Sequence, residues 1–516
     1  MSSGYPMNSR RIKLFLALGL AVLLSARLLL QFILYRSGFT CLTADEFART
    51  IMSAHWARHP QLICHGVWLP FHQYFLGFLL RLKWELLWTP RIAWMAMGAL
   101  SIVLIYFFSR RLFRSRSVGL ISAILLASNP LHIWLSSTPL SELPYLTAIL
   151  AFLLSFTLYL RRDKIIYLYL SAFLLIAGNG FRYESWLLTM VFSLYTAVEG
   201  IRRFRHVNKG RLLTSLAAAL LPWIVPLLWL VGNYEQSGSA LYFLEFNRIL
   251  DLSAFGSRRS YLNLFGALFR IDPVTSILGV VGLGAALIRF RHDRAVHYYV
   301  AASVIPFILF FLLQGGRATL PGNYLRYLAS FVFFIYPALA YFLVMVIDYL
   351  SRASRPRLII LALIVGLLAS ARIRASFLFD NDPAGAGLKV GEKIRLLRNG
   401  DFSISSRPVL IEASSWEHLA IEVGANDVTS LLMDRKIIDE ARDRRTPSLL
   451  LADKETMMDF LTGRGVSYVV VKSPELKQAM EKDLELESRG EANGYIFYLI
   501  PPDFDKTEGV ENKVLR

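Results

Sequence analysis

Long apolar segments recur through the first three quarters of the chain and restrict the folds that it can adopt. Each is about 17–25 residues long, enough for a helix to cross the roughly 30 Å hydrocarbon layer of a membrane. Within lipid, backbone polar groups are satisfied only in helices and closed barrels. We therefore predict a mainly α fold, a polytopic transmembrane helical bundle of about eleven spans. These spans are expected near residues 14–35, 91–108, 117–136, 143–160, 165–178, 185–199, 212–232, 273–288, 296–313, 328–349 and 358–373.

The charge of the chain follows the same membrane pattern. The net charge is +18 over 516 residues, and 55% of the residues are hydrophobic. In a soluble protein such a charge would suggest a nucleic-acid partner. Here the Lys and Arg residues form short clusters between apolar segments, which is the distribution that membrane topology produces. We therefore expect membrane lipids, and no nucleic acid, among the partners.

The basic clusters also predict an orientation. With a cytoplasmic N-terminus, six clusters of three to five Lys or Arg residues face the cytoplasm. They are Arg10–Lys13, Arg110–Arg116, Arg161–Lys164, Arg202–Arg211, Arg289–Arg294 and Arg352–Arg357. Of two short opposite loops, residues 137–141 carry no Lys or Arg, and residues 178–184 carry only Arg182. Because cytoplasmic loops are enriched in these residues, we expect the C-terminus on the non-cytoplasmic side.

The composition becomes that of a soluble protein near the C-terminus, which predicts two domains. We expect a transmembrane domain at residues 1–374, whose external loop 36–90 carries an acidic motif. Residues 375–516 are expected to form a small external α/β domain, because strand and helix patterns alternate there. The expected strands are residues 408–413, 466–472 and 495–500, and the expected helices are residues 453–461 and 475–487.

Two acidic positions on the external side are candidates for chemistry. Thr43 and Glu46 have the spacing of a capping box, which explains Glu46 by structure alone. Asp45 then either complements the dipole of the same helix or acts in catalysis. Glu142 follows Ser141 at the start of the fourth span and has the same two interpretations. Two carboxylates at one membrane face could provide a base and its orienting partner, or could hold a divalent cation.

Three arginines are candidates for binding an anion. Arg326, followed by Tyr327, leads into the tenth span and could form a fork with a phosphate, or could anchor the helix at the membrane interface. Arg182 stands in an external turn, where pairing with Glu184 is the alternative. Arg27 lies inside the first span, where snorkelling toward the interface is sufficient to explain it.

Cysteine and histidine residues in the first external loop suggest no definite site. Cys41 and Cys64 could form a disulfide in an oxidising compartment or remain as two unpaired thiols. His55 and His59 are spaced to share a helix face, as metal ligands can be. However, the spacing provides no Cys or carboxylate that completes a metal site.

An ordered set of motifs resembles a known group of enzymes. Ala44–Arg49, His65–Tyr74, Ser109–Phe113 and Glu142 occur in an order and topology similar to those of the GT-C glycosyltransferases. The resemblance is to the protein O-mannosyltransferase and lipid A aminoarabinose transferase group (glycosyltransferase family 39-like), and it covers most of the first 190 residues. One departure is the Leu69–His72 step, where family members often have Lys-Pro or Pro-Pro.

The resemblance implies a reaction and roles for individual residues. These enzymes displace a polyprenyl phosphate from the anomeric carbon of a sugar, which needs a base for the acceptor hydroxyl and cations for the departing phosphate. The implied residues are Asp45, Glu46 and Glu142 for catalysis, Arg326, Tyr327 and Arg182 for the donor phosphate, and Trp68, His72 and Tyr74 for substrate binding. Trp68 and Tyr74 could equally be interfacial anchors. A divalent metal ion, if one is used, would bind Asp45 and Glu142.

We therefore expect an integral-membrane glycosyltransferase that uses an undecaprenyl- or dolichyl-phosphate sugar, with inversion, on the non-cytoplasmic face. The acceptor would be a glycan, lipid or protein. The expected location is the bacterial inner membrane, with the endoplasmic reticulum as the alternative. A transporter or flippase of lipid-linked sugars, or a non-catalytic scaffold in cell-envelope glycan assembly, is the other reading. Transporters usually place ions near the midplane between related halves, and the sequence shows no such halves.

Overall fold

The computed structural model divides into two compact units. It describes residues 9–204, 209–255, 272–314, 326–350, 366, 381–400, 407–413, 416–439 and 444–501. Internal contacts group residues 1–38, 62–72 and 91–380 into one unit, here called the helical unit, and residues 39–61, 73–90 and 381–516 into a second, the α/β unit. The boundary expected between residues 374 and 375 lies outside the described residues.

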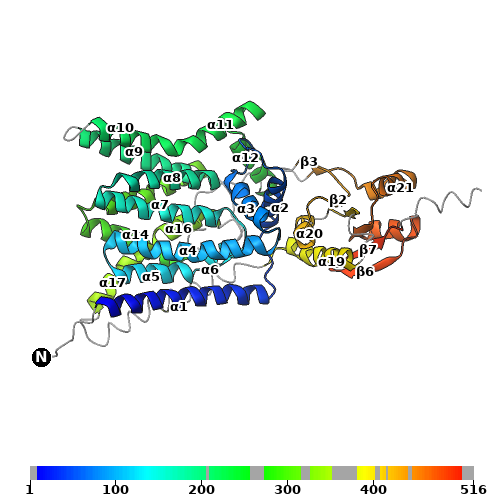
Figure 1. Ribbon diagram of the computed structural model, residues 1–516, viewed down its shortest axis with the longest axis horizontal. Coiled ribbons are helices and arrows are strands. Elements are labelled where there is room, and N and C mark those ends of the chain that lie inside the picture. The colour runs from blue at the N-terminus through cyan, green and yellow to red at the C-terminus, as the bar shows by residue number, and fades with distance from the viewer. Residues whose placement is uncertain are drawn as a thin grey trace, which may run out of the picture. The chain divides into compact units, whose positions relative to one another are not determined.

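Helices that run side by side form the helical unit (Figure 1). Within it α7 packs along α8, α9 along α10, and α14 along α17. Its described helices are α1 (Ser9–Arg36), α4 (Trp88–Phe113), α5 (Arg116–Ala127), α6 (Pro130–Leu135), α7 (Glu142–Arg162), α8 (Ile165–Phe181), α9 (Glu184–Phe204), α10 (Lys209–Leu220), α11 (Ile224–Ser237), α12 (Tyr242–Phe255), α14 (Pro273–Arg289), α15 (Arg294–Gln314), α16 (Ala329–Phe334) and α17 (Tyr336–Leu350).

The length and composition of these helices make the chain an integral membrane protein. Among the described residues, five helices are long and apolar enough to cross a membrane. A sixth span results if Arg326–Phe334 and Tyr336–Tyr349, which are bent by 43° relative to each other, are taken as one. Shorter apolar helices, among them α5, α8 and most of α14, accompany these spans. The predicted fold class is confirmed, although the span expected near residues 358–373 lies, except for residue 366, outside the described residues.

One expected span is broken into two helices. Residues 117–136 were predicted to form a single helix. In the structure, α5 ends at Ala127 and α6 begins at Pro130. Pro130 lacks an N–H and fixes φ, so it favours the first position of a new helix. The Asn129 side chain accepts a hydrogen bond from the His132 N–H at 3.1 Å and caps α6. The chain after α6 then runs without regular structure as far as Glu142, which begins α7.

Aromatic and small residues hold the helices of this unit together. The rings of Phe156 and Tyr298 join α7 to α15 with their centroids 4.4 Å apart, and Phe192 of α9 packs edge-on against Phe156 at 5.2 Å. Where α14 meets α17, a Cβ added at Gly282 would lie 2.4 Å from the Ala338 carbonyl oxygen. Only glycine permits this close approach of the two backbones.

The α/β unit contains a five-stranded sheet with two apolar faces. The strand order is β2-β1-β5-β7-β6, in which β1 pairs in parallel with β2 and β5, and β7 pairs antiparallel with β5 and β6. Alternate residues of β5, Val469 and Tyr468, point into different apolar clusters. The strands are β1 (Val409–Ile411), β2 (Leu431–Met433), β5 (Tyr468–Val471), β6 (Ser488–Ala492) and β7 (Tyr495–Leu499), with a separate hairpin of β3 (Ile437–Asp439) and β4 (Arg444–Arg445).

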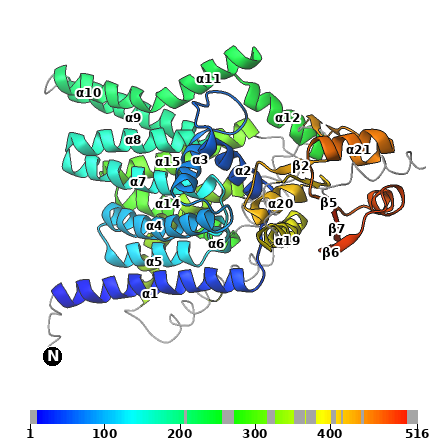
Figure 2. The same ribbon diagram turned by 45° about the vertical axis from the view of Figure 1, so that its right-hand side comes forward.

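Helices from two distant parts of the sequence complete this unit. Both views of the chain show α19 beside α20 (Figure 2). The segment before α4 contributes as well, because α2 packs on α20 and the Trp84 indole N–H donates to the Asn426 carbonyl at 3.3 Å. Cys41 is buried in this unit, and neither Cys41 nor Cys64 is joined in a disulfide to another described cysteine. The helices are α2 (Asp45–Arg58), α3 (Phe71–Leu82), which begins in the helical unit, α19 (Gly387–Gly400), α20 (Glu417–Ala425), α21 (Lys454–Gly463) and α22 (Pro474–Gln478).

A buried carboxyl on α20 couples the stability of the α/β unit to pH. Burial, and to a lesser extent the negative charge of Asp427, raise the pKa of Glu422 from 4.5 to about 8. Burial would raise the pKa of Asp427 too. Hydrogen bonds from Ser430, Thr429 and Arg398 outweigh that effect and lower it. Glu422 is therefore protonated at neutral pH while Asp427 is ionised.

We expect the free energy of unfolding of the α/β unit to fall as the pH rises from about 5 to about 8, by up to about 1.4 kcal/mol per pH unit. The folded unit binds the Glu422 proton more tightly than the unfolded chain does. This contribution is therefore complete below pH 4.5 and lost as the pH passes 8. Glu422→Gln should flatten the dependence and make the unit more stable at pH 8. Hydrogen-exchange protection of the α20 amides measures this pH dependence. The control is Glu455→Gln, which changes an exposed glutamate of the same unit. Equal pH slopes in both variants would contradict the assignment.

Candidate functional site

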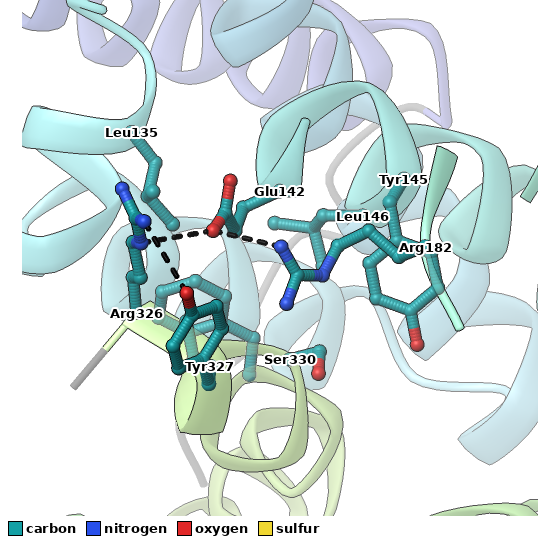
Figure 3. Close-up of a pocket in the computed structure, with 10 residues that line it drawn as sticks. Leu135, Glu142, Tyr145, Leu146, Arg182, Arg326, Tyr327 and Ser330 are labelled. Carbon is teal, nitrogen blue, oxygen red and sulfur yellow. Dashed lines mark hydrogen bonds and ion pairs between the residues drawn. The ribbon is translucent and has the colours of Figure 1, made fainter. Parts of the chain in front are cut away.

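A buried carboxylate between two guanidinium groups is the centre of the candidate site. Glu142 begins α7 and is only 5% exposed. Its Oε1 atom lies 2.8 Å from Nη1 of Arg182 and 3.3 Å from Nε of Arg326. The two arginines approach Glu142 from different sides (Figure 3). A carboxylate at a helix N-terminus also meets the positive end of the helix dipole.

Arg182 is held by a second carboxylate. It follows the last residue of α8, and its Nε and Nη2 atoms reach Oε2 and Oε1 of Glu184 at 3.0 and 2.5 Å. This two-bond geometry is the strongest arrangement available to an arginine and a carboxylate. Burial alone would lower the pKa of Arg182, but the Glu184 and Glu142 carboxylates raise it above its ordinary value. The pairing with Glu184 considered from the sequence is therefore present, together with the bond to Glu142.

Tyr327 lies within reach of both cations. The guanidinium carbon of Arg182 is 5.1 Å from the centre of the Tyr327 ring, and that of Arg326 is 5.2 Å from it. Such distances allow cation–π attraction. An Arg326 Nη2 atom also donates to the Tyr327 hydroxyl at 3.4 Å. Arg326, which is 4% exposed, thus points into the bundle and does not serve as an interfacial anchor in this structure.

The cavity beside these groups is small and electrically balanced. Its volume is about 10 Å³, room for roughly one water molecule. Two arginines and one glutamate line it, and Glu184, which pairs with Arg182 outside the lining, brings the formal charges of the group to zero. The lining residues are Leu135, Glu142, Tyr145, Leu146, Arg182, Arg326, Tyr327, Ala329, Ser330 and Phe333. The arrangement suits an anionic group with oxygen acceptors, since two guanidinium groups provide planar sets of N–H donors.

The acids predicted in the first external loop belong to the α/β unit. Asp45 is the first residue of α2 and is partly buried. Glu46 is 2% exposed, and its Oε1 atom accepts the Leu42 N–H at 3.0 Å. In the predicted capping box, the Glu46 carboxylate would accept the backbone N–H of Thr43. It accepts instead the N–H of the preceding residue, Leu42. The catalytic roles of Asp45 and Glu46 stay predictions.

The residues predicted to bind substrate have other neighbours. His72 is buried, and its Nε2 atom lies 2.9 Å from the Pro139 carbonyl oxygen. Trp68, like His72, belongs to the helical unit but is not among the residues that line the cavity. Tyr74 belongs to the α/β unit, where its ring lies 5.2 Å from that of Trp56. Within the described ranges, no three His, Cys, Asp or Glu residues are grouped as metal ligands would be.

Some residues of the site gave no signal in the sequence. Tyr145 and Ser330 line the cavity from inside two apolar segments, where nothing distinguishes them from packing residues. The prediction that Arg27 snorkels was wrong. Arg27 is 4% exposed and points into the bundle, where its Nη2 atom donates to the His132 carbonyl at 3.3 Å. A snorkelling side chain would keep its charge in water.

Comparison with known proteins supports the resemblance predicted from the sequence. Residues 59–229 match the family described as dolichyl-phosphate-mannose-protein mannosyltransferase. This segment contains Glu142 and Arg182 but is less than half of the chain. No curated protein sequence matches the chain significantly.

Solved structures show that the chain has the fold of GT-C glycosyltransferases. It matches ArnT from Cupriavidus metallidurans in the apo state with a TM-score of 0.59 and 14% identity, over 95% of this chain and 99% of ArnT. The match to the same protein bound to undecaprenyl phosphate has a TM-score of 0.57 and 11% identity, over 93% and 97%. The match to the oligosaccharyltransferase of Archaeoglobus fulgidus, tethered with an acceptor peptide, has a TM-score of 0.45 and 13% identity, over 84% of this chain and 65% of that one.

We expect Arg182→Met to lower the free energy of unfolding by about 3–5 kcal/mol, because it leaves Glu184 buried without its strongest partner. The double variant Arg182→Met, Glu184→Gln should recover part of that loss. Arg211→Met is the matched control: its ion pair with Asp163 is exposed, with 51% and 45% of the side chains accessible, and should contribute less than about 1 kcal/mol. Unfolding of the detergent-solubilised protein measures all three. Equal losses for Arg182→Met and Arg211→Met would contradict the buried ion-pair network.

Proposed function

We propose that this protein is a membrane glycosyltransferase that moves a sugar from a polyprenyl-phosphate carrier to an acceptor hydroxyl. The observation that carries the proposal is the pair of buried arginines, Arg182 and Arg326, that converge on the single carboxylate of Glu142. A sugar-linked phosphodiester, like a carboxylate, presents acceptor oxygens and one negative charge, and the phosphate monoester that is released carries more. The GT-C fold and the match to the mannosyltransferase family agree with this reaction class.

The arginines would act on the leaving group. When the bond between the anomeric carbon and the phosphate oxygen breaks, negative charge grows on the phosphate. Buried guanidinium groups stabilise that charge more effectively than water does, because they are already oriented. Tyr327 would support both arginines through its ring and add a hydroxyl. The undecaprenyl phosphate bound in the related ArnT structure is a ligand of the chemical class that we propose for the donor.

The acids would act on the acceptor. Displacement at the anomeric carbon requires a base to remove the proton of the attacking hydroxyl, and attack opposite the leaving phosphate inverts the configuration. We assign Asp45 to this role on the sequence resemblance, with Glu46 beside it in the chain. Glu142 is the second acid, which holds the arginines in place until the donor phosphate arrives. The non-cytoplasmic face and the bacterial inner membrane belong to the same proposal.

One observation favours a second candidate, a flippase of lipid-linked sugars. Arg326 begins a helix pair that is bent by 43°, and transporters often bind charged substrates at broken helices. A flippase would move the lipid-linked sugar intact and would need no base. Transfer of the sugar to an acceptor by the purified protein therefore separates the two.

We expect Glu142→Gln to bind undecaprenyl phosphate about tenfold more tightly, because the neutral amide no longer competes for the two arginines. Turnover should fall by about 100-fold or more, measured as build-up of the lipid-linked sugar in cells whose only copy is the variant. Arg326→Met should weaken binding by about tenfold. The control is Glu199→Gln. Glu199 is also buried and pairs with an arginine, Arg294, but neither residue lines the cavity.

Three results would contradict this proposal. Normal sugar transfer by a folded double variant with Asp45→Asn and Glu142→Gln would exclude both acids from the chemistry. Weaker binding of undecaprenyl phosphate by Glu142→Gln would mean that Glu142 helps to bind the phosphate and does not compete with it. Equal effects of Glu199→Gln would show that any loss of a buried charge disturbs the bundle.

A further inference from the structure

A polar stripe on α1 faces the bundle, although most of the apolar window of this helix is exposed in the described structure. Only 11% of the apolar window of α1 is buried, yet Arg27 and Gln31 are 4% and 1% exposed. Tyr35 continues the pattern at the next interval of four residues. Residues spaced by four lie on one face of a helix. The stripe therefore presents three hydrogen-bonding side chains to the same neighbour.

That neighbour is the segment that leads from α6 to Glu142. Gln31 Nε2 donates to the Ser136 carbonyl at 2.7 Å and approaches the hydroxyls of Ser136 and Ser137 at 3.1 and 3.2 Å. The Tyr35 hydroxyl donates to the Ser137 carbonyl at 2.6 Å. Arg27 bonds to the Ser136 hydroxyl and to the last turn of α6. The stripe thus holds the first half of the segment.

Two other elements hold the second half. The Nε2 atom of His72 lies 2.9 Å from the Pro139 carbonyl oxygen, and since a carbonyl only accepts, this nitrogen carries the proton. The indole N–H of Trp94, on α4, donates to the Leu140 carbonyl at 2.7 Å. The remaining carbonyl, that of Thr138, accepts the Leu140 N–H. Each backbone carbonyl from residue 136 to residue 140 therefore has a hydrogen-bond donor.

This arrangement fixes where Glu142 begins its helix. Irregular backbone within a membrane bundle is stable only where its polar groups are satisfied. Here the satisfaction comes mainly from side chains of other helices, so the path of the segment depends on those side chains. Residues 136–141 end directly at Glu142, whose carboxylate must meet two guanidinium groups at once. A displacement of about 1 Å in such a site can change rates by about 100-fold.

We propose that Gln31 and Tyr35, with Arg27, are positioning residues for Glu142. They act through the backbone of residues 136–141 and do not touch the substrate. The inference rests on the proposed function, in which Glu142 holds the two arginines until the donor phosphate arrives. A stripe that only docked α1 to the bundle would affect stability alone.

Affinity for undecaprenyl phosphate distinguishes positioning from docking. Tyr35→Phe removes one hydroxyl but keeps the ring, on which the Arg91 guanidinium rests at 4.6 Å from the centroid. Gln31→Leu removes the amide donors. Each variant should release Glu142 partly from the arginines, so undecaprenyl phosphate should bind about threefold more tightly while turnover falls by about tenfold. A purely structural defect would not raise affinity.

The double variant Gln31→Leu, Glu142→Gln tests whether the stripe acts through Glu142. Its affinity for undecaprenyl phosphate should equal that of Glu142→Gln alone, because a residue that acts through another has no further effect once that residue is changed.

Tyr498→Phe is the matched control for Tyr35→Phe. It removes a buried hydroxyl that donates to Glu481 at 2.7 Å in the α/β unit, and it should change neither affinity nor turnover.

The outcomes separate this inference from the proposed function. If Glu142→Gln changes affinity and turnover as proposed but Tyr35→Phe and Gln31→Leu leave both unchanged, the positioning role is overturned and the glycosyltransferase proposal stands. The positioning role is also overturned if Gln31→Leu weakens the binding of undecaprenyl phosphate by the same factor whether residue 142 is Glu or Gln. If undecaprenyl phosphate binds to none of the proteins, both the proposed donor and the positioning role are rejected.

Discussion

Glu142, Arg182 and Arg326 lie where water is almost excluded, and a buried charge is tolerated only beside an opposite one. The three side chains come from the start of α7, the turn after α8 and the start of the bent pair that includes α16 and α17. Their ion pairs therefore join parts of the bundle that are far apart in the sequence. The helices around them have to meet at this point, since any other register would leave a charge without a partner.

Glu142 and Arg182 could be singled out in the sequence because their surroundings carry little charge. Residues 137–141 have no Lys or Arg, so Glu142 and Arg182 stand out at the external ends of apolar segments. The stripe on α1 was equally visible, with Arg27 and Gln31 four residues apart. Its meaning was missed because its partners are mainly backbone carbonyls, and a carbonyl leaves no trace in a sequence. The sequence pattern likewise does not predict how deeply a polar side chain and its partner are buried.

The same limit applies to the α/β unit. Strands β1, β5 and β7 were predicted from their apolar sequence patterns, and most of their residues are buried in the structure. Strand β6, Ser488–Ala492, was not, since it is a polar edge strand with little burial. The break before Pro130 shows the converse in the helical unit: hydrophobicity continues through residues 117–136, and only the local chemistry of Asn129 and Pro130 divides it. Apolar pattern predicts elements well, whereas edges and breaks depend on single residues and on tertiary partners.

The cavity beside Glu142 holds roughly one water molecule, and its formal charges already cancel. A soluble anion that entered would have to displace a carboxylate of the protein with no gain other than its own charge. A ligand that also buries a long hydrocarbon chain among the helices gains a large further free energy, about 0.8 kcal/mol for each methylene group. In the proposed reaction, an internal counter-ion would thus let the bundle reject the abundant phosphates of the aqueous phase and accept those that arrive within the bilayer.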